Sequence, residues 1–211
     1  MEGVTANRNQ FVEWIVELQS FAQAGLTYEH DSYDLERYSR IREISAEMLA
    51  NLAELPVEKV QNLFCRETGY QTPKIDTRAA IFDGDRILLV RESNGEWALP
   101  GGWCDVNQSI AENTIKEARE EAGLAVTADR LIAVQDRNRH NAPAYAYGIV
   151  KVFVLCSATG GWFQPNIETT ESGYFPLNAL PENLALEKTT REQIELCFRA
   201  KSADNWIVPF D

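Results

Sequence analysis

The sequence has few of the features that mark a secreted or disulfide-bonded protein. It contains only four cysteines in 211 residues, and no two of them form a CxxC pair. The widely spaced Cys65, Cys104, Cys156 and Cys197 fit reduced, mostly buried thiols better than a zinc site or a disulfide framework. The opening residues, MEGVTANRNQ, contain neither the basic nor the apolar segment of a signal peptide. We therefore expect a cytoplasmic protein.

Basic residues and long apolar runs are also scarce. The chain has 20 Lys and Arg against 32 Asp and Glu, which gives a formal net charge of -12. Because affinity for duplex nucleic acid comes largely from basic residues at the phosphates, we expect no such partner. No apolar run approaches the ~18 residues that span a bilayer, so no membrane association is expected. A small anionic nucleotide remains possible as a partner, if a divalent cation bridges its phosphates to clustered carboxylates.

Apolar periodicity divides the chain into a helical region, residues 1–69, and a mixed region, residues 74–211. In the helical region apolar side chains recur at helical spacing, and Gly25 is expected to end the first helix. A helical region of this size has little capacity for a core of its own. We therefore expect it to pack on the rest of the chain or on another subunit. The expected helices are residues 11–25, residues from about 34 to 52, and residues 56–63.

The mixed region begins with strand patterns. TRAAIF and RILLVRE, residues 77–82 and 86–92, flank the turn Asp83-Gly84-Asp85, which predicts a β-hairpin. Strands and helices then alternate, which favours an α/β fold with a mixed sheet covered by helices. The other expected strands are residues 96–100, 131–136, 147–156 and 171–175, and the expected helices are residues 109–122 and 190–201.

Three glutamates share one face of the expected helix at residues 109–122. Glu117, Glu120 and Glu121 stand at positions i, i+3 and i+4, which at ~100° per residue places them within an arc of ~100°. A hard divalent cation, Mg²⁺ or Mn²⁺, is the simplest compensation for their repulsion, and it prefers oxygen ligands. The alternative is an acidic face that contacts only water. The double glycine at 101–102 favours the metal, because glycine allows the backbone and its carbonyls to approach a ligand closely.

The segment GGWCDVNQSIAENTIKEAREEAGL, residues 101–124, resembles the Nudix box, Gx5Ex7REUxEExGU, in which U is a bulky aliphatic residue. The match comprises Gly102 and residues 116–124, preceded by LPG at 99–101. This resemblance implies the Nudix fold, an α/β/α sandwich in which the box forms a loop, a helix and a loop around metal ions. It also implies that the Gly101 carbonyl and the three glutamates named above bind Mg²⁺ or Mn²⁺.

Two positions depart from the box. Its first glutamate is Gln108 here, and its arginine is Lys116. If both positions belong to one supporting contact, their joint change is less damaging than two independent losses. We therefore expect an enzyme, and the alternative is a noncatalytic nucleotide-binding or regulatory protein.

A second resemblance covers residues 14–49, from WIVELQS to SAEML. This segment looks like the helical extension before the Nudix domain in bacterial hydrolases of X-linked nucleoside diphosphates (NDP-X), CDP-choline pyrophosphatases among them. Similar proteins also carry a GGWxDV motif, present here at residues 101–106. The resemblance implies a homodimer in which residues 1–69 support dimerisation or the substrate site. It also implies hydrolysis of CDP-choline or, next, ADP-ribose, to a nucleoside monophosphate and an X-phosphate.

The reaction also needs a group that orients or deprotonates the attacking water. In Nudix enzymes this group is commonly a glutamate, either inside the box or outside it. Glu120 is the candidate inside the box, and Glu168 and Glu171 are the candidates in the late segment IETTESGYFPLNALP. For each late glutamate the alternative is a solvated charge on an edge strand.

Basic residues near the expected strand ends are candidates for binding the substrate. Arg78 and Arg91 lie on the two strands of the hairpin, where they could reach a diphosphate or form exposed salt bridges. Arg137 and His140 belong to the polar segment QDRNRHNAPAYAYG, residues 135–148, which is expected to select the substrate.

Overall fold

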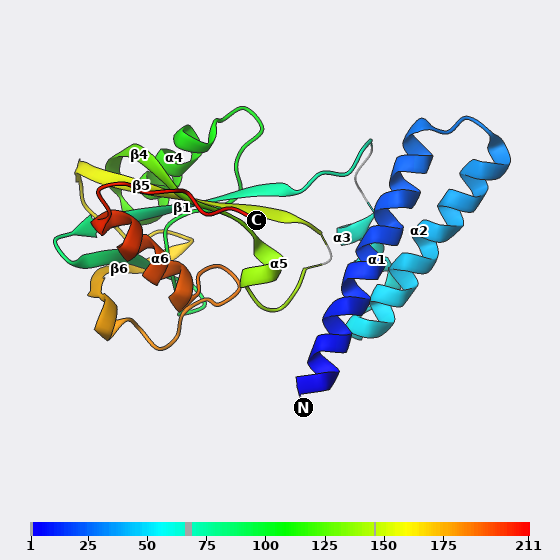
Figure 1. Ribbon diagram of the computed structural model, residues 1–211, viewed down its shortest axis with the longest axis horizontal. Coiled ribbons are helices and arrows are strands. Elements are labelled where there is room, and N and C mark those ends of the chain that lie inside the picture. Colours follow the sequence, from blue (N-terminus) through cyan, green and yellow to red (C-terminus); the bar gives the residue numbers. More distant parts are fainter. Residues whose placement is uncertain (1, 66–68, 146) are drawn as a thin grey trace. The chain divides into compact units, whose positions relative to one another are not determined.

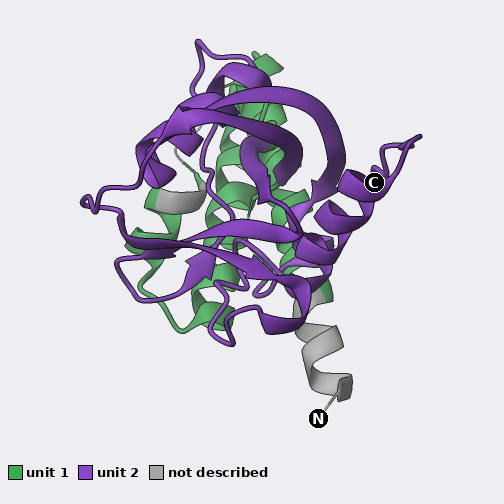
Figure 2. Cartoon of the chain, turned by 90° about the vertical axis from the view of Figure 1, so that its left-hand side faces the viewer, with its two compact units in different colours: residues 1–73, 144–148 green, residues 74–143, 149–211 purple. Residues whose placement is uncertain are grey.

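The computed structural model describes residues 2–65, 69–145 and 147–211 (Figure 1). The chain separates into two compact units (Figure 2). Unit 1 contains residues 1–73 and 144–148, and unit 2 contains residues 74–143 and 149–211. The grouping of 144–148 with unit 1 is a feature that the sequence did not predict. None of the helices in the described ranges has the combined length and hydropathy of a membrane span.

Unit 1 is helical, as predicted, but its first helix is longer than expected. Gly25 does not end that helix, which continues to Tyr28. The glycine instead allows close packing inside the unit, because a Cβ at Gly25 would lie 2.5 Å from ring atoms of Tyr38. The second helix begins at an Asp31 cap, whose carboxylate accepts hydrogen bonds from two backbone amides. The helices are α1 (Glu2–Tyr28), α2 (Ser32–Ala53) and α3 (Val57–Phe64).

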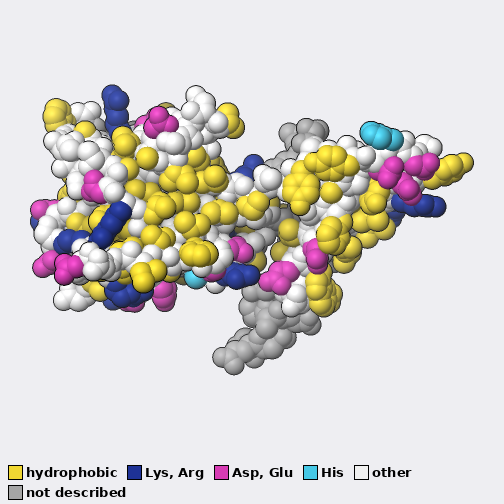
Figure 3. All heavy atoms as spheres, turned by 45° about the horizontal axis from the view of Figure 1, so that its top comes forward, with side chains coloured by type: hydrophobic (Ala, Val, Ile, Leu, Met, Phe, Trp, Pro, Cys, Tyr) yellow, Lys and Arg dark blue, Asp and Glu magenta, His cyan; other side chains and the backbone are white. Residues whose placement is uncertain are grey.

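The apolar side chains of unit 1 are divided between an inner and an outer face. The inner core is small and draws on all three helices, with Ile15, Leu49 and Val60 among its buried members. A second set of large apolar side chains on α1 and α2 remains more than a third exposed, and Figure 3 shows hydrophobic side chains along these helices. The apolar side chains that recur at helical spacing therefore form two faces, one buried in the core of unit 1 and one exposed. The exposed set is Phe11, Trp14, Leu18, Phe21, Tyr28, Tyr33, Ile41, Ile44 and Met48.

Unit 2 is built on the predicted mixed sheet. The strand order is β3-β2-β1-β5-β4, and β6 pairs with β2. β1 and β5 are parallel, whereas the other pairs are antiparallel. The strands are β1 (Lys74–Asp83), β2 (Arg86–Glu92), β3 (Trp97–Ala98), β4 (Leu124–Asp136), β5 (Ile149–Gly161) and β6 (Thr169–Pro176).

Two strands are longer than the apolar runs that predicted them. β4 begins at Leu124, directly after the α4 cap Gly123, and β5 extends to Gly161. In their added parts exposed residues are frequent, so an apolar run marks only the better buried half of each strand. Their pairing also passes through three register shifts, which disrupt a simple alternation of apolar and polar residues.

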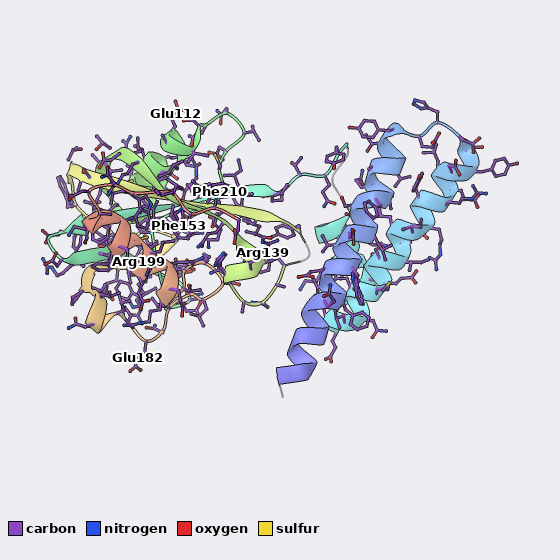
Figure 4. The ribbon with its side chains drawn as sticks, in the orientation of Figure 1. Glu112, Arg139, Phe153, Glu182, Arg199 and Phe210 are labelled. Carbon is purple, nitrogen blue, oxygen red and sulfur yellow. The ribbon has the colours of Figure 1, made fainter. Side chains whose placement is uncertain are left out.

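Helices cover both faces of this sheet, which confirms the expected α/β/α layering. α4 packs on one face in a cluster with Ile81 and Val154, and α6 packs on the other face in a cluster with Phe153. Figure 4 shows Phe153 among the strands, whereas Glu112 and Glu182 point outward. The helical elements are α4 (Ile110–Ala122), α5 (Arg137–His140), the 3-10 turn Leu177–Ala179 and α6 (Arg191–Ser202).

Candidate active site

The double glycine that precedes α4 lies against β1. The Pro100 carbonyl accepts a hydrogen bond from Ala79 N at 2.8 Å, and the Gly102 carbonyl accepts one from Thr77 N at 2.9 Å. Gly101 has a φ of 147°, and a Cβ there would lie 1.9 Å from the Thr77 carbonyl oxygen. Only glycine fits such a close approach, and the two backbone hydrogen bonds hold the loop against β1.

Two glutamates of α4 reach this loop. Glu121 Oε2 accepts a hydrogen bond from Gly101 N at 2.8 Å. Glu117 is 8% exposed, and its Oε2 lies 3.0 Å from the position that a Cβ on Gly102 would take. Glu120 is different, because its side chain is 57% exposed. The i, i+4 pair therefore faces the glycines, whereas the third glutamate lies toward solvent.

The charges on this face are only partly compensated within the chain. Burial raises the pKa of Glu121 to about 7, although the Arg78 charge opposes this rise. Burial also raises the pKa of Glu117, against the effect of Lys116. The Lys116 ammonium lies 3.3 Å from Glu117 Oε1 and 3.7 Å from Glu120 Oε2. One ammonium thus lies near both of these glutamates, although its shortest contact is with Asp105, at 2.8 Å.

The chemistry of these donors fits a hard divalent cation. The candidate ligands are all oxygens, namely the carboxylates of the three box glutamates and the Gly101 carbonyl. A cation beside Glu121 would also favour the ionised carboxylate that burial disfavours. Within the described residues, no group of three or more His, Cys, Asp or Glu side chains already stands close enough to hold a metal. Joint ligation therefore requires side-chain rotation, which the exposure of Glu120 permits.

The loop before β6 is bonded to the C-terminal end of α4. Asn166 Nδ2 donates to the Glu120 carbonyl at 2.8 Å, and Thr169 Oγ1 donates to the Glu121 carbonyl at 2.8 Å. Glu168 lies between these two anchors and has an exposed side chain. The two bonds therefore bring the Glu168 segment to the end of the helix that carries the box glutamates.

Glu171, the other late candidate, pairs with Arg91. Its Oε2 lies 3.5 Å from Arg91 Nη1, and the two side chains are 56% and 43% exposed. Arg91 Nε also donates to the Gly95 carbonyl at 3.1 Å. Arg91 therefore forms the exposed salt bridge that was the alternative to phosphate binding, and such a pair contributes little stability.

Arg78 is buried among charged partners. Its Nε and Nη2 donate to the Asp76 carboxylate at 3.1 and 2.8 Å, and its Nη1 donates to the Leu99 carbonyl at 3.2 Å. Lys151 Nζ lies 3.4 Å from the same aspartate, and burial together with repulsion from Arg78 lowers the pKa of Lys151 to about 7. Through its hydrogen bond to the Leu99 carbonyl, Arg78 holds the segment that leads into the double glycine.

Arg137 and His140 lie in the short helix α5. Arg137 is 1% exposed and donates to the backbone carbonyls of Glu187, at 3.3 Å, and of Pro143. His140 Nε2 lies 2.6 Å from Asp211 Oδ2. Both side chains are thus engaged within unit 2, and their part in substrate selection stays a prediction.

Some polar residues that organise the site were not predicted from the sequence. Asn113 is fully buried on α4, where its Nδ2 donates to Thr77 Oγ1 at 2.8 Å and its Oδ1 accepts from Asp105 N at 3.3 Å. Asn113 could have been found in the sequence as an asparagine on the apolar face of the predicted amphipathic helix. Lys151 could likewise have been found as the single charged residue inside the apolar run IVKVFVLC. The side-chain contacts of Asn166 could not be read from the sequence.

Comparison with known families bears out the resemblances drawn from the sequence. Residues 72–197 match the family model described as NUDIX domain. Residues 9–64 match the model described as a UDP-X-like, N-terminal oligomerisation domain. The second match lies on the helices of unit 1, and the first lies almost entirely on unit 2.

Relatives and solved structures agree with these matches. "Putative ADP-ribose pyrophosphatase YjhB" of Bacillus subtilis (strain 168) is 40% identical over 192 residues, which cover 90% of this chain and 92% of that protein. A solved ADP-ribose pyrophosphatase from Streptococcus suis 89-1591 is 52% identical, with a TM-score of 0.62, covering 66% of this chain and 100% of that one. A solved UDP-X diphosphatase is 33% identical, with a TM-score of 0.62, covering 96% and 98%. Because the NUDIX match spans more than half of the sequence, the chain belongs to the Nudix hydrolases, and within them it is a pyrophosphatase.

Proposed function

We propose that this protein hydrolyses the diphosphate linkage of an NDP-X compound of the ADP-ribose type, with Mg²⁺ or Mn²⁺, to a nucleoside monophosphate and an X-phosphate. The observation that carries the proposal is the 2.8 Å hydrogen bond from Gly101 N to Glu121 Oε2. It joins the box helix to the double glycine, where Glu117 is also buried. Two carboxylates whose pKa values are raised by burial, side by side at such a loop, are characteristic of a functional site.

The residues that would hold the cation are Glu117, Glu120, Glu121 and the Gly101 carbonyl. When bound, the cation supplies charge neutralisation at the nonbridging oxygens of the diphosphate and at the leaving phosphate. The chain itself contributes position. The hydrogen bonds of the glycine loop with β1 fix the backbone, and burial keeps the Glu117 carboxylate against Gly102.

The attacking water requires a carboxylate that orients it or accepts its proton. Glu168 is the stronger of the two late candidates, because Asn166 and Thr169 tie its segment to the end of α4. Glu171 is paired with Arg91 instead. Glu120, as the exposed box glutamate, remains the candidate inside the box.

The relatives favour ADP-ribose as the first substrate to test. Two of the proteins that resemble this chain over most of their length bear names that specify ADP-ribose, and a third is named for UDP-X. The helical extension placed CDP-choline first among the expected substrates, but none of these names specifies CDP-choline. We therefore place ADP-ribose ahead of CDP-choline.

A substrate comparison tests this proposal. With Mg²⁺ present, kcat/KM for ADP-ribose is expected to exceed that for CDP-choline by at least about tenfold, or ~1.4 kcal/mol in barrier. Product release is measured for ADP-ribose, CDP-choline and UDP-glucose, each with Mg²⁺ and with excess chelator. Faster turnover of CDP-choline would refute the ADP-ribose assignment. Absence of metal-dependent hydrolysis with every NDP-X compound would support the noncatalytic alternative.

For assembly, we propose that residues 1–69 mediate a homodimer and that residues 74–211 form the catalytic domain. The support is the outer apolar face of unit 1. Trp14, Leu18 and Phe21 stand at i, i+4 and i+7 on α1, and each is at least 40% exposed. Such an apolar row along one helix is costly to expose to water and suits a second copy of the same surface.

Interruption of this row is expected to yield monomers. The double variant Trp14→Glu, Phe21→Glu should halve the mass that light scattering reports at micromolar concentration, because two charges would be buried in the interface. Ile207→Glu is the matched control, since Ile207 is an apolar residue of unit 2 that is 91% exposed. A wild-type protein that is already monomeric would rule out the homodimer.

A further inference from the structure

The box position occupied by Gln108 does not support Lys116. Gln108 Oε1 is buried and accepts no hydrogen bond from the described residues. Lys116 Nζ instead lies 2.8 Å from Asp105 Oδ2. The acidic partner of the box cation therefore stands three residues earlier on the loop than the box pattern places a glutamate.

Lys116 links this aspartate to the candidate metal ligands. The same ammonium lies 3.3 Å from Glu117 Oε1 and 3.7 Å from Glu120 Oε2. It is only partly exposed, at 27%, and Asp105 is its shortest contact of the three. A cation so placed neutralises Glu117 and Glu120, and it competes with a divalent ion for the same carboxylates.

The segment that carries Asp105 is itself held in place. Asp105 N donates to Asn113 Oδ1 at 3.3 Å, and the Asp105 carbonyl accepts from Gln108 N at 3.0 Å. Asn113 is fully buried and bonded to Thr77 of β1. The backbone of Asp105 is therefore anchored, through Asn113, to both α4 and the sheet. This anchoring holds the Asp105 carboxylate near Lys116.

We infer that Asp105 is a positioning residue, which holds the Lys116 ammonium and so leaves Glu117 and Glu120 available to a divalent cation. The inference rests on the proposed metal-dependent function. On this inference, the box tolerates glutamine at position 108 because Asp105 supplies the carboxylate that pairs with Lys116. Without the Asp105 carboxylate, the Lys116 ammonium would pair only with Glu117 and Glu120. Metal binding would weaken, because the ammonium then competes more strongly for these two carboxylates. The turnover rate at saturating metal should change little, since Asp105 acts through Lys116.

Mn²⁺ binding without substrate, followed by electron paramagnetic resonance, tests this inference. Asp105→Asn is expected to weaken Mn²⁺ binding by about three- to fivefold, the scale of one partly exposed ion pair. Gln108→Glu alone should stay within about twofold of wild type. The double variant Asp105→Asn, Gln108→Glu should recover most of the loss, because a carboxylate returns to the loop. Asp83→Asn is the control, since it removes an exposed ion pair with Arg86 outside the site.

A stability cycle without metal gives a second readout. Asp105→Asn and Lys116→Met should be non-additive in denaturant unfolding if the two side chains interact. Mn²⁺ affinity equal to the Asp83→Asn control, or no rescue by Gln108→Glu, would overturn the inference alone. A wild-type protein that binds no Mn²⁺ and hydrolyses no NDP-X compound would instead overturn the proposed function.

Discussion

Glu121→Gln is expected to lower kcat at saturating Mg²⁺ by at least about a thousandfold, equivalent to ~4 kcal/mol in barrier. Glutamine can still accept the hydrogen bond from Gly101 N, but it offers a divalent cation no charge. Steady-state product release from ADP-ribose measures the effect. Glu182→Gln, an outward-facing glutamate of unit 2, should leave kcat unchanged (Figure 4). A Glu121→Gln variant with more than a tenth of the wild-type rate would show that the metal face is misassigned.

The same substitution should not destabilise the protein without metal. Burial raises the pKa of Glu121 from 4.5 to about 7, so its protonated form is favoured by folding. Its contribution to stability is fully present below about pH 4.5 and is lost as the pH rises through about 7. In chelator, the melting temperature of wild type should therefore fall over this range by more than that of Glu121→Gln. At pH 8, Mg²⁺ should restore the melting temperature of the wild type. It should raise the melting temperature of Glu121→Gln by less.

The second large effect is expected at Glu168. Glu168→Gln should lower kcat by about a hundredfold with little change in KM, the scale of losing one general base. Glu171→Gln, the matched control on β6, should change kcat by less than about threefold, because its partner is the exposed Arg91. Both variants are measured with ADP-ribose at saturating Mg²⁺.

The comparison of these two variants discriminates between the late glutamates. A large loss at Glu171 with none at Glu168 would reverse the assignment. If neither variant loses activity, Glu120 inside the box becomes the group that handles water. In that case the hydrogen bonds of Asn166 and Thr169 to α4 serve only to hold the loop.

The sequence alone determined the features that depend on local spacing. The box pattern predicted the helix that runs to Ala122 and the two glutamates, Glu117 and Glu121, that face the double glycine, because helical periodicity fixes which side chains share a face. The strand patterns around the turn Asp83-Gly84-Asp85 likewise predicted the hairpin, and the succession of strands and helices predicted the mixed sheet. The sequence also predicted that the extension is helical. It did not predict the role of Gly25, because that role depends on the ring of Tyr38, which lies on another helix.

Only the tertiary structure decided which polar groups meet across long separations in the chain. Arg78 and Arg91 look alike in the sequence, yet one is buried against Asp76 and the other forms an exposed pair. The preference for Glu168 over Glu171 likewise comes from hydrogen bonds between the late loop and α4. A residue's partner across the fold depends on strand register and loop path, which periodicity does not encode. For the same reason, the sequence showed that Gln108 departs from the box, and the fold showed Asp105 beside Lys116.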